Sequence, residues 1–134
     1  MSGPIVIELG YIPPAEVRGN SRAHWRVKYK VSKDMKAAGL WNGMLAKDGM
    51  RFQPLIQLRL AQEKGTLRIS FAFFHTRKID LDNLAIGMKP FVDGLVESEL
   101  LVDDDPDHVV YGEHSFTLCK KGESRTVVTI EETA

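Results

Sequence analysis

Two aspartates separated by one residue, Asp80 and Asp82, have the chemistry and spacing of a catalytic or metal-binding pair. In an extended segment they would point the same way, with Cα atoms roughly 6.6 Å apart at about 3.3 Å per residue. Neighbouring carboxylates repel each other unless a proton or a cation lies between them. Mg²⁺ commonly binds one or two carboxylates and keeps positions for water and phosphate oxygens. The pair therefore predicts a Mg²⁺ site or, more simply, a helix N-cap, for which Asp is a preferred residue.

A second acidic cluster, Asp103-Asp104-Asp105-Pro106-Asp107, follows further along the chain. An EF-hand calcium loop needs Gly at its sixth position and Glu at its twelfth, and His108 and His114 stand there instead. The two acidic groups lie on either side of one amphipathic helical pattern, so they can meet at the same end of a sheet. A solvated acidic turn is the alternative interpretation.

Charges are segregated along the chain, although 18 basic and 18 acidic residues give a net charge of zero. From Arg18 to Lys36 there are seven basic residues and one acidic residue; from Asp80 to Asp107 there are nine acidic residues and one basic residue, Lys89. Lys89 either balances charge or contacts phosphate. The basic segment is either a solvated helix face or a surface for a phosphate backbone, so the neutral total excludes only a uniformly cationic binder.

The length and composition predict a single domain spanning residues 1–134. The 43% hydrophobic content excludes a disordered chain, and no apolar run is long enough to span a membrane. The single cysteine, Cys119, allows no intrachain disulfide and has no zinc-like spacing with the four histidines. With no signal-peptide pattern at the N-terminus, we expect a cytoplasmic protein.

The elements that must position these residues follow from periodicity. Strands are predicted at Pro4–Leu9 and Thr66–Phe74, the second with Leu67, Ile69, Phe71 and Phe73 on one face. A helix is predicted from Arg22 to about Leu45, with Asn20 or Ser21 as its N-cap. The structure of Asp48–Gln62 stays open.

The acidic pair precedes a predicted helix, Asn83–Val96, in which Pro90 predicts a kink or a restart. Val109–Leu118 and Thr126–Ile130 are predicted to form a β-hairpin. This order predicts an α/β or α+β fold, a single small domain with a mixed β-sheet flanked by helices.

Three segments match one known family: Asp80-Leu81-Asp82-Asn83-Leu84, Lys89-Pro90-Phe91-Val92-Asp93-Gly94-Leu95 and Leu101-Val102-Asp103-Asp104-Asp105. Together they resemble the RusA family of Holliday-junction resolvases, endodeoxyribonucleases often carried by phages and prophages. Asn20-Ser21-Arg22-Ala23-His24-Trp25 is also similar to the start of such proteins. The resemblance spans about residues 20 to 115 and implies a RusA-like fold.

The resemblance implies a homodimeric, Mg²⁺-dependent enzyme that acts in DNA recombination and repair, with Mn²⁺ as a substitute metal. Such enzymes resolve branched DNA, the four-way junction, by paired symmetric nicks. The implied catalytic acids and metal ligands are Asp80, Asp82 and Asp104, with Asp103 as a further metal ligand. Asp105 matches the second member of the later acidic pair equally well.

The family's helix lysine, which contacts DNA or supports catalysis, would be Lys89. It lies seven residues after Asp82, whereas the commonest family pattern has it four residues after, where this sequence has Ile86. The role of Lys89 is therefore an expectation from the resemblance alone.

Backbone phosphates would be bound by the basic residues near the predicted long helix and just before the acidic pair: Arg22, Arg26, Lys28, Lys30, Arg77 and Lys78. Two other functions fit the same residues. One is a non-catalytic DNA-binding relative that binds without Mg²⁺ and cuts nothing. The other is a metal-dependent hydrolase of nucleotides or phosphoesters, in which the basic segment is ordinary helix surface.

Overall fold

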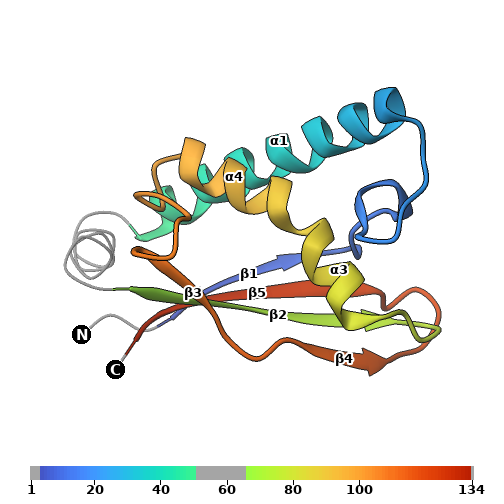
Figure 1. Ribbon diagram of the computed structural model, residues 1–134. Coiled ribbons are helices and arrows are strands. Elements are labelled where there is room, and N and C mark those ends of the chain that lie inside the picture. Colours follow the sequence, from blue (N-terminus) through green and yellow to red (C-terminus); the bar gives the residue numbers. More distant parts are fainter. Residues whose placement is uncertain (1–3, 51–65, 134) are drawn as a thin grey trace.

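The computed structural model describes residues 4–50 and 66–133 as a five-stranded mixed sheet with helices packed on it (Figure 1). The elements in chain order are β1 Ile5–Leu9, the short 3-10 helix η1 Ala15–Val17, α1 Trp25–Met50, β2 Leu67–His75, α3 Leu81–Gly87, α4 Lys89–Glu97, β3 Val109–Tyr111, β4 Ser115–Leu118 and β5 Arg125–Glu132. The predicted α+β class with a mixed sheet is confirmed. In the described residues α1, α3 and α4 share one face of the sheet.

The sheet has the strand order β1-β5-β2-β3, and β4 also pairs with β2. β3 and β4 run parallel to β2, along successive halves of the same edge, and the other pairs are antiparallel. β2 is therefore the central strand, and the loop that leaves its end leads directly to the acidic pair.

The predicted hairpin between Val109–Leu118 and Thr126–Ile130 is wrong. β5 follows β4 after a turn in which Gly122 has a φ of +87°, but β5 pairs with β1 and β2. It buries Thr126, Val128 and Ile130 completely, which favours a position with a strand on each side. β4 is mostly exposed, as is typical of an edge strand. The short connection between β4 and β5 suggested a hairpin, but both strands pair with β2 instead, on opposite edges of it.

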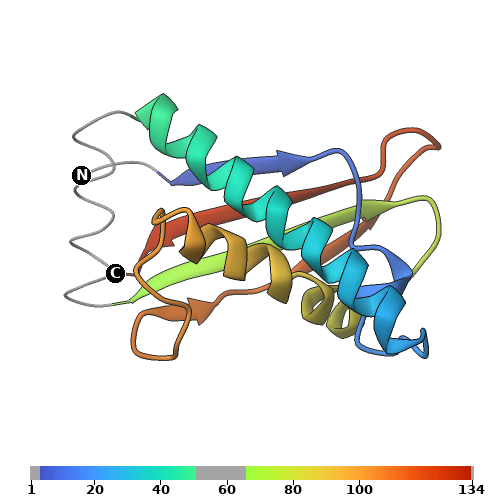
Figure 2. The ribbon, with the colours of Figure 1, turned by 90° about the horizontal axis from the view of Figure 1, so that it is seen from above.

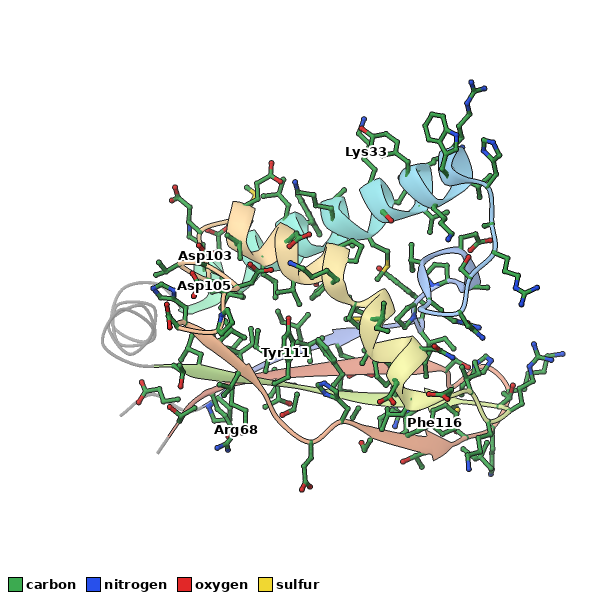
Figure 3. All side chains as sticks on the ribbon, in the orientation of Figure 1. Lys33, Arg68, Asp103, Asp105, Tyr111 and Phe116 are labelled. Atoms are coloured by element: carbon green, nitrogen blue, oxygen red, sulfur yellow. The ribbon has the colours of Figure 1, made fainter. Side chains whose placement is uncertain are left out.

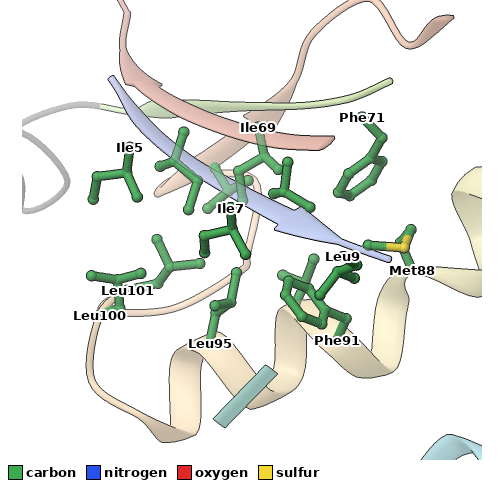
Figure 4. Close-up of a cluster of buried hydrophobic side chains, with 14 of the residues drawn as sticks. Ile5, Ile7, Leu9, Ile69, Phe71, Met88, Phe91, Leu95, Leu100 and Leu101 are labelled. Carbon is green, nitrogen blue, oxygen red and sulfur yellow. The ribbon is translucent and has the colours of Figure 1, made fainter. Parts of the chain in front are cut away.

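The core lies between the sheet and the helices (Figure 4). The alternation predicted for β2 is confirmed, since Leu67, Ile69, Phe71 and Phe73 are all buried. Phe91, Val92 and Leu95 of α4 pack into the same cluster. Complete burial of such a side chain contributes about 1.5–3 kcal/mol, so this cluster fixes α4 on the sheet.

Pro90 marks a restart, as the sequence predicts. α3 ends at Gly87, and α4 begins at Lys89 with Pro90 in its first turn, where a missing backbone N–H breaks no helical hydrogen bond. The break turns the chain so that α3 and α4 follow different directions over the sheet (Figure 1).

The long helix α1 begins later than predicted. The N-cap assignment to Asn20 or Ser21 is wrong: Nδ1 of His24 accepts from the backbone N–H of Arg26 at 3.2 Å, and the His24 carbonyl accepts from the N–H groups of Val27 and Lys28. The helix extends to Met50 rather than Leu45. The rest of the open segment, residues 51–62, lies outside the described residues.

Helices α1 and α4 lie side by side across the sheet (Figure 2) and touch through two glycines. A Cβ added to Gly94 would lie 2.1 Å from the carbonyl oxygen of Lys36 and 2.6 Å from the backbone nitrogen of Leu40. A Cβ on Gly39 would lie 2.0 Å from the carbonyl oxygen of Phe91. The two backbones are therefore in direct contact, and this contact sets the position of the helix that carries Lys89.

Among the described residues, no helix combines the length and the apolar character that crossing a bilayer requires.

Candidate functional site

The acidic pair lies at the start of α3. Asp80 is the N-cap residue, and its Oδ1 accepts from the backbone N–H of Asp82 at 2.9 Å. The N-cap interpretation is thus confirmed. The extended arrangement expected for the pair is wrong, because Leu81 is already helical. Both carboxylates are exposed, and the cap uses one Asp80 oxygen, so a cation can bind the second.

Lys89 stands at the centre of a charged cluster at the start of α4. Its Nζ donates to Oδ1 of Asp93 at 2.6 Å and to Oδ2 of Asp104, which lies in the loop that follows α4. Partial burial lowers the pKa of Lys89, but the hydrogen bonds to Asp104 and Asp93 outweigh it and hold this pKa far above its ordinary value. The hydrogen bond from Lys89 lowers the pKa of Asp104. Lys89 was predicted either to balance charge or to contact phosphate. Its bonds to Asp93 and Asp104 show that it balances charge in this structure.

The three consecutive aspartates after α4 have different surroundings. Asp104 faces Lys89, and its backbone N–H donates to Oδ1 of Asp103 at 2.7 Å. Asp105 is used locally: its Oδ1 accepts from the backbone N–H groups of Asp107 and His108 and lies 2.7 Å from Nδ1 of His108. Figure 3 shows Asp103 and Asp105 in this loop. Asp104 thus contacts α4 through Lys89, whereas Asp105 bonds within its own loop.

His108 provides a pH-dependent prediction in this loop. Its hydrogen bond to Asp105 raises its pKa above the ordinary value of 6.5. A histidine whose pKa rises on folding contributes stability that is complete below the unfolded value and is lost as the pH rises through the folded value. We expect an NMR titration to place the His108 pKa above 6.5, and Asp105→Asn to return it toward that value. Asp34→Asn on α1 should leave it unchanged; an Asp105→Asn titration identical to wild type would contradict the assignment.

A pocket of about 420 Å³ lies beside Lys89 and is lined in part by α3, the helix that begins at the acidic pair. Its walls come from α3, α4, β2 and the β3–β4 edge, and its lining residues are Phe71, Ala85, Ile86, Lys89, Tyr111 and His114. Tyr111 lies on the helix side of the sheet (Figure 3). The His114 ring stacks on Phe71 with centroids 4.7 Å apart and meets Tyr111 edge-on at 5.9 Å. The rings of Phe71, Tyr111 and His114 therefore lie together in the lining of this pocket, beside Lys89.

Electrostatic effects connect the pocket to both acidic groups. Burial lowers the pKa of His114, and the charge of Asp82 acts on the same ring in the opposite direction. Burial raises the pKa of Tyr111, which also responds to Lys89 and Asp104. Lys89, Tyr111 and His114 line the same pocket, and α3, which begins at the acidic pair, forms another of its walls.

The predicted ligands do not form one cluster in the part of the chain that the structure describes. In residues 4–50 and 66–133 no three side chains of His, Cys, Asp or Glu lie close enough together to share a metal ion. Asp80 and Asp82 form one pair, Asp103 and Asp104 another, and Asp104 is bonded to Lys89. The metal role of all four residues stays a prediction.

The predicted DNA-binding residues lie at one end of the molecule, where the start of α1, η1 and the β2–α3 loop come together (Figure 1). Most are exposed; the exception is Lys28, which is half-buried and donates to the carbonyl of Ser21 at 3.0 Å. The exposed members are Arg22, Arg26, Lys30, Arg77 and Lys78. The loop before α1 is joined to α3 by the bond from the N–H of Gly19 to the carbonyl of Asn83 at 3.1 Å. The basic end therefore borders the acidic pair.

Tyr111 and His114 are the site residues that sequence reasoning missed. Both stand in or beside the short strands β3 and β4, whose pairing with β2 depends on contacts distant in sequence. Neither residue belongs to a motif with a characteristic spacing, so the sequence did not indicate a role for Tyr111 or His114.

Comparison of the chain with models of known protein families finds no match, and comparison with curated proteins finds no similar sequence.

Proposed function

We propose that this protein is a Mg²⁺-dependent endodeoxyribonuclease that resolves four-way DNA junctions by paired symmetric hydrolysis of phosphodiester bonds. The observation that carries the proposal is that the elements bearing both acidic groups border one pocket. Ala85 and Ile86 line it from α3, the helix that begins at the acidic pair, and Lys89, which bonds to Asp104, lines it from α4. The resemblance of the sequence to RusA-family resolvases supports the same activity.

The acidic pair fits the proposed metal. Asp80 and Asp82 are exposed and lie next to each other at a helix start, and Mg²⁺ needs only one or two carboxylates beside its waters. Mn²⁺ prefers the same oxygen ligands. Asp104 already has a cationic partner in Lys89, so it would have to exchange that bond to become a ligand. We therefore assign the metal first to Asp80 and Asp82, with Asp103 and Asp104 as further candidates.

Metal bound at this pair would supply an activated water and offset negative charge on the phosphate. The remaining chemistry comes from the chain itself. Lys89, held protonated by Asp93 and Asp104, places a positive charge beside the pocket, where it can stabilise charge that develops on phosphate oxygens. The cap formed by Asp80 fixes the first turn of α3 and so fixes the backbone of Asp82.

The basic end of the molecule supports a DNA partner. Its exposed arginines and lysines would bind backbone phosphates next to the acidic pair, with an affinity that falls steeply as salt increases. A junction needs two matching cuts, and a homodimer would supply two identical sites. The single cysteine suits a cytoplasmic location.

A substrate panel tests the proposal: labelled four-way junction, linear duplex of the same sequence and a nucleotide mixture, each with Mg²⁺, with Mn²⁺ and with EDTA. We expect cleavage of the junction in either metal, far less cleavage of the duplex and none in EDTA. Binding of the junction without cleavage in any metal would indicate a non-catalytic DNA-binding relative. Turnover of nucleotides without a preference for branched DNA would indicate a phosphoester hydrolase.

A further inference from the structure

The feature that carries a further inference is a gap in the strand pairing beside the pocket. β3 pairs with Leu67–Ile69 of β2, and β4 pairs with Ala72–His75 of the same strand. Between these two stretches the backbone N–H of Phe71 donates to Nδ1 of His114, at 3.0 Å. In a continuous neighbouring strand, a backbone carbonyl would accept this hydrogen bond. Here Nδ1 of His114 accepts it instead.

This hydrogen bond determines the tautomer of His114. A neutral imidazole carries one N–H, so a ring whose Nδ1 accepts a hydrogen bond carries its proton on Nε2. Half-burial of the ring and its stacking on Phe71 favour the neutral form over the cation. Because Nδ1 accepts from the strand, Nε2 is the donor that this ring retains, and the ring lines the pocket.

We propose that His114 is a fixed, neutral hydrogen-bond donor that binds a phosphodiester oxygen in the pocket through its Nε2–H group. The phosphate-binding role rests on the proposed nuclease function; the tautomer rests on the Phe71 bond alone. Such a donor would be useful here, since Lys89 lines the same pocket and places a positive charge beside it. A proton on Nε2 excludes this nitrogen as a metal ligand and as a general base, so His114 complements the acidic pair rather than joining it.

The tautomer is measured on the wild-type protein, without substrate, by NMR correlation of the ring nitrogens with the ring carbon-bound protons. We expect an unprotonated Nδ1 and a protonated Nε2 at neutral pH, unchanged when Mg²⁺ is added. A proton on Nδ1, a mixture of the two tautomers, or a shift that shows Mg²⁺ on Nε2 would overturn the proposal. This readout is independent of nuclease activity.

Two variants test the role on the four-way junction. His114→Asn retains an acceptor for the Phe71 N–H but removes the outer donor, and we expect junction cleavage to fall by about 10², the loss typical of one phosphate or oxyanion donor. His114→Gln places an amide N–H near the position of Nε2 and should retain more activity. Equal loss in both variants would assign His114 a purely structural role, and wild-type cleavage in His114→Asn would refute the contact. If the wild-type protein cuts no junction, the proposed function fails while the tautomer measurement still stands.

Discussion

Replacing Gly94 by alanine is expected to destabilise the folded protein by about 3 kcal/mol, at the upper end of the usual cost of overpacking. In an exposed helix the same change would stabilise by roughly 0.5–1 kcal/mol, because alanine loses less conformational freedom than glycine. Here the added Cβ would lie 2.1 Å from the Lys36 carbonyl oxygen and 2.6 Å from the Leu40 backbone nitrogen. Both obstacles are backbone atoms, so the clash is relieved only if α4 moves away from α1.

Chemical denaturation measures this change in the free energy of unfolding, and the corresponding loss in melting temperature is roughly 10 °C for a domain of this size. Gly10→Ala is the matched control, since a Cβ there meets nothing within 4 Å. We expect the control to unfold like the wild type. Because α4 carries Lys89 and Asp93, displacement of α4 should also disturb the lysine cluster. A Gly94→Ala protein within 0.5 kcal/mol of the wild type would show that the two helices are not packed as described.

Replacing Asp82 by asparagine is expected to reduce junction cleavage by at least about 10². Loss of a residue that only supports a metal ligand typically lowers metal affinity or activity about 10–100-fold. Asp82 is proposed to be a ligand itself, so its loss should cost at least as much. The fold should tolerate the change, because Asp82 is exposed and its backbone N–H, not its side chain, bonds to Asp80. Loss of a negative charge from the first turn of α3 costs about 0.3–1 kcal/mol.

Single-turnover cleavage and DNA binding are measured together for Asp82→Asn. Binding should be retained, because removing a negative charge next to the basic end does not weaken attraction for phosphate. Glu123→Gln, an equal loss of charge in the exposed β4–β5 turn, should cut like the wild type. Cleavage by Asp82→Asn within twofold of the wild-type rate would exclude the acidic pair from catalysis.

Local patterns in the sequence predicted much of the fold. The alternation in β2 placed Leu67, Ile69, Phe71 and Phe73 in the core, and Pro90 marked the boundary between α3 and α4. These features depend on neighbours one to four residues away, which a single sequence contains. The choice of strand partners depends on contacts distant in the chain, and this is why the hairpin prediction for β4 and β5 was wrong.

The candidate site was predictable to a similar extent. The spacing of Asp80 and Asp82 identified an acidic pair before a helix, but the extended geometry failed because Asp80 caps that helix. The sequence did not show which of Asp103, Asp104 and Asp105 would act in the site. Their contacts distinguish two of them, because Asp104 bonds to Lys89 and Asp105 bonds to His108. A histidine acceptor beyond Asn20 and Ser21 caps α1 because ring nitrogen can replace the usual side-chain oxygen. The sequence pattern offered the Asp80 cap as one of two alternatives, whereas the Lys89–Asp104 bond joins residues distant in the chain and could not be predicted.

The proposed junction cleavage is tested most directly by mapping the nicks in a four-way junction whose strands are labelled one at a time. We expect Mg²⁺ to produce nicks in two opposed strands at symmetric positions, and EDTA to abolish them. This result requires both the chemistry proposed for the acidic pair and two identical sites acting on one junction. An intact junction in Mg²⁺ and in Mn²⁺, or cleavage of linear duplex at the same rate, would contradict the account.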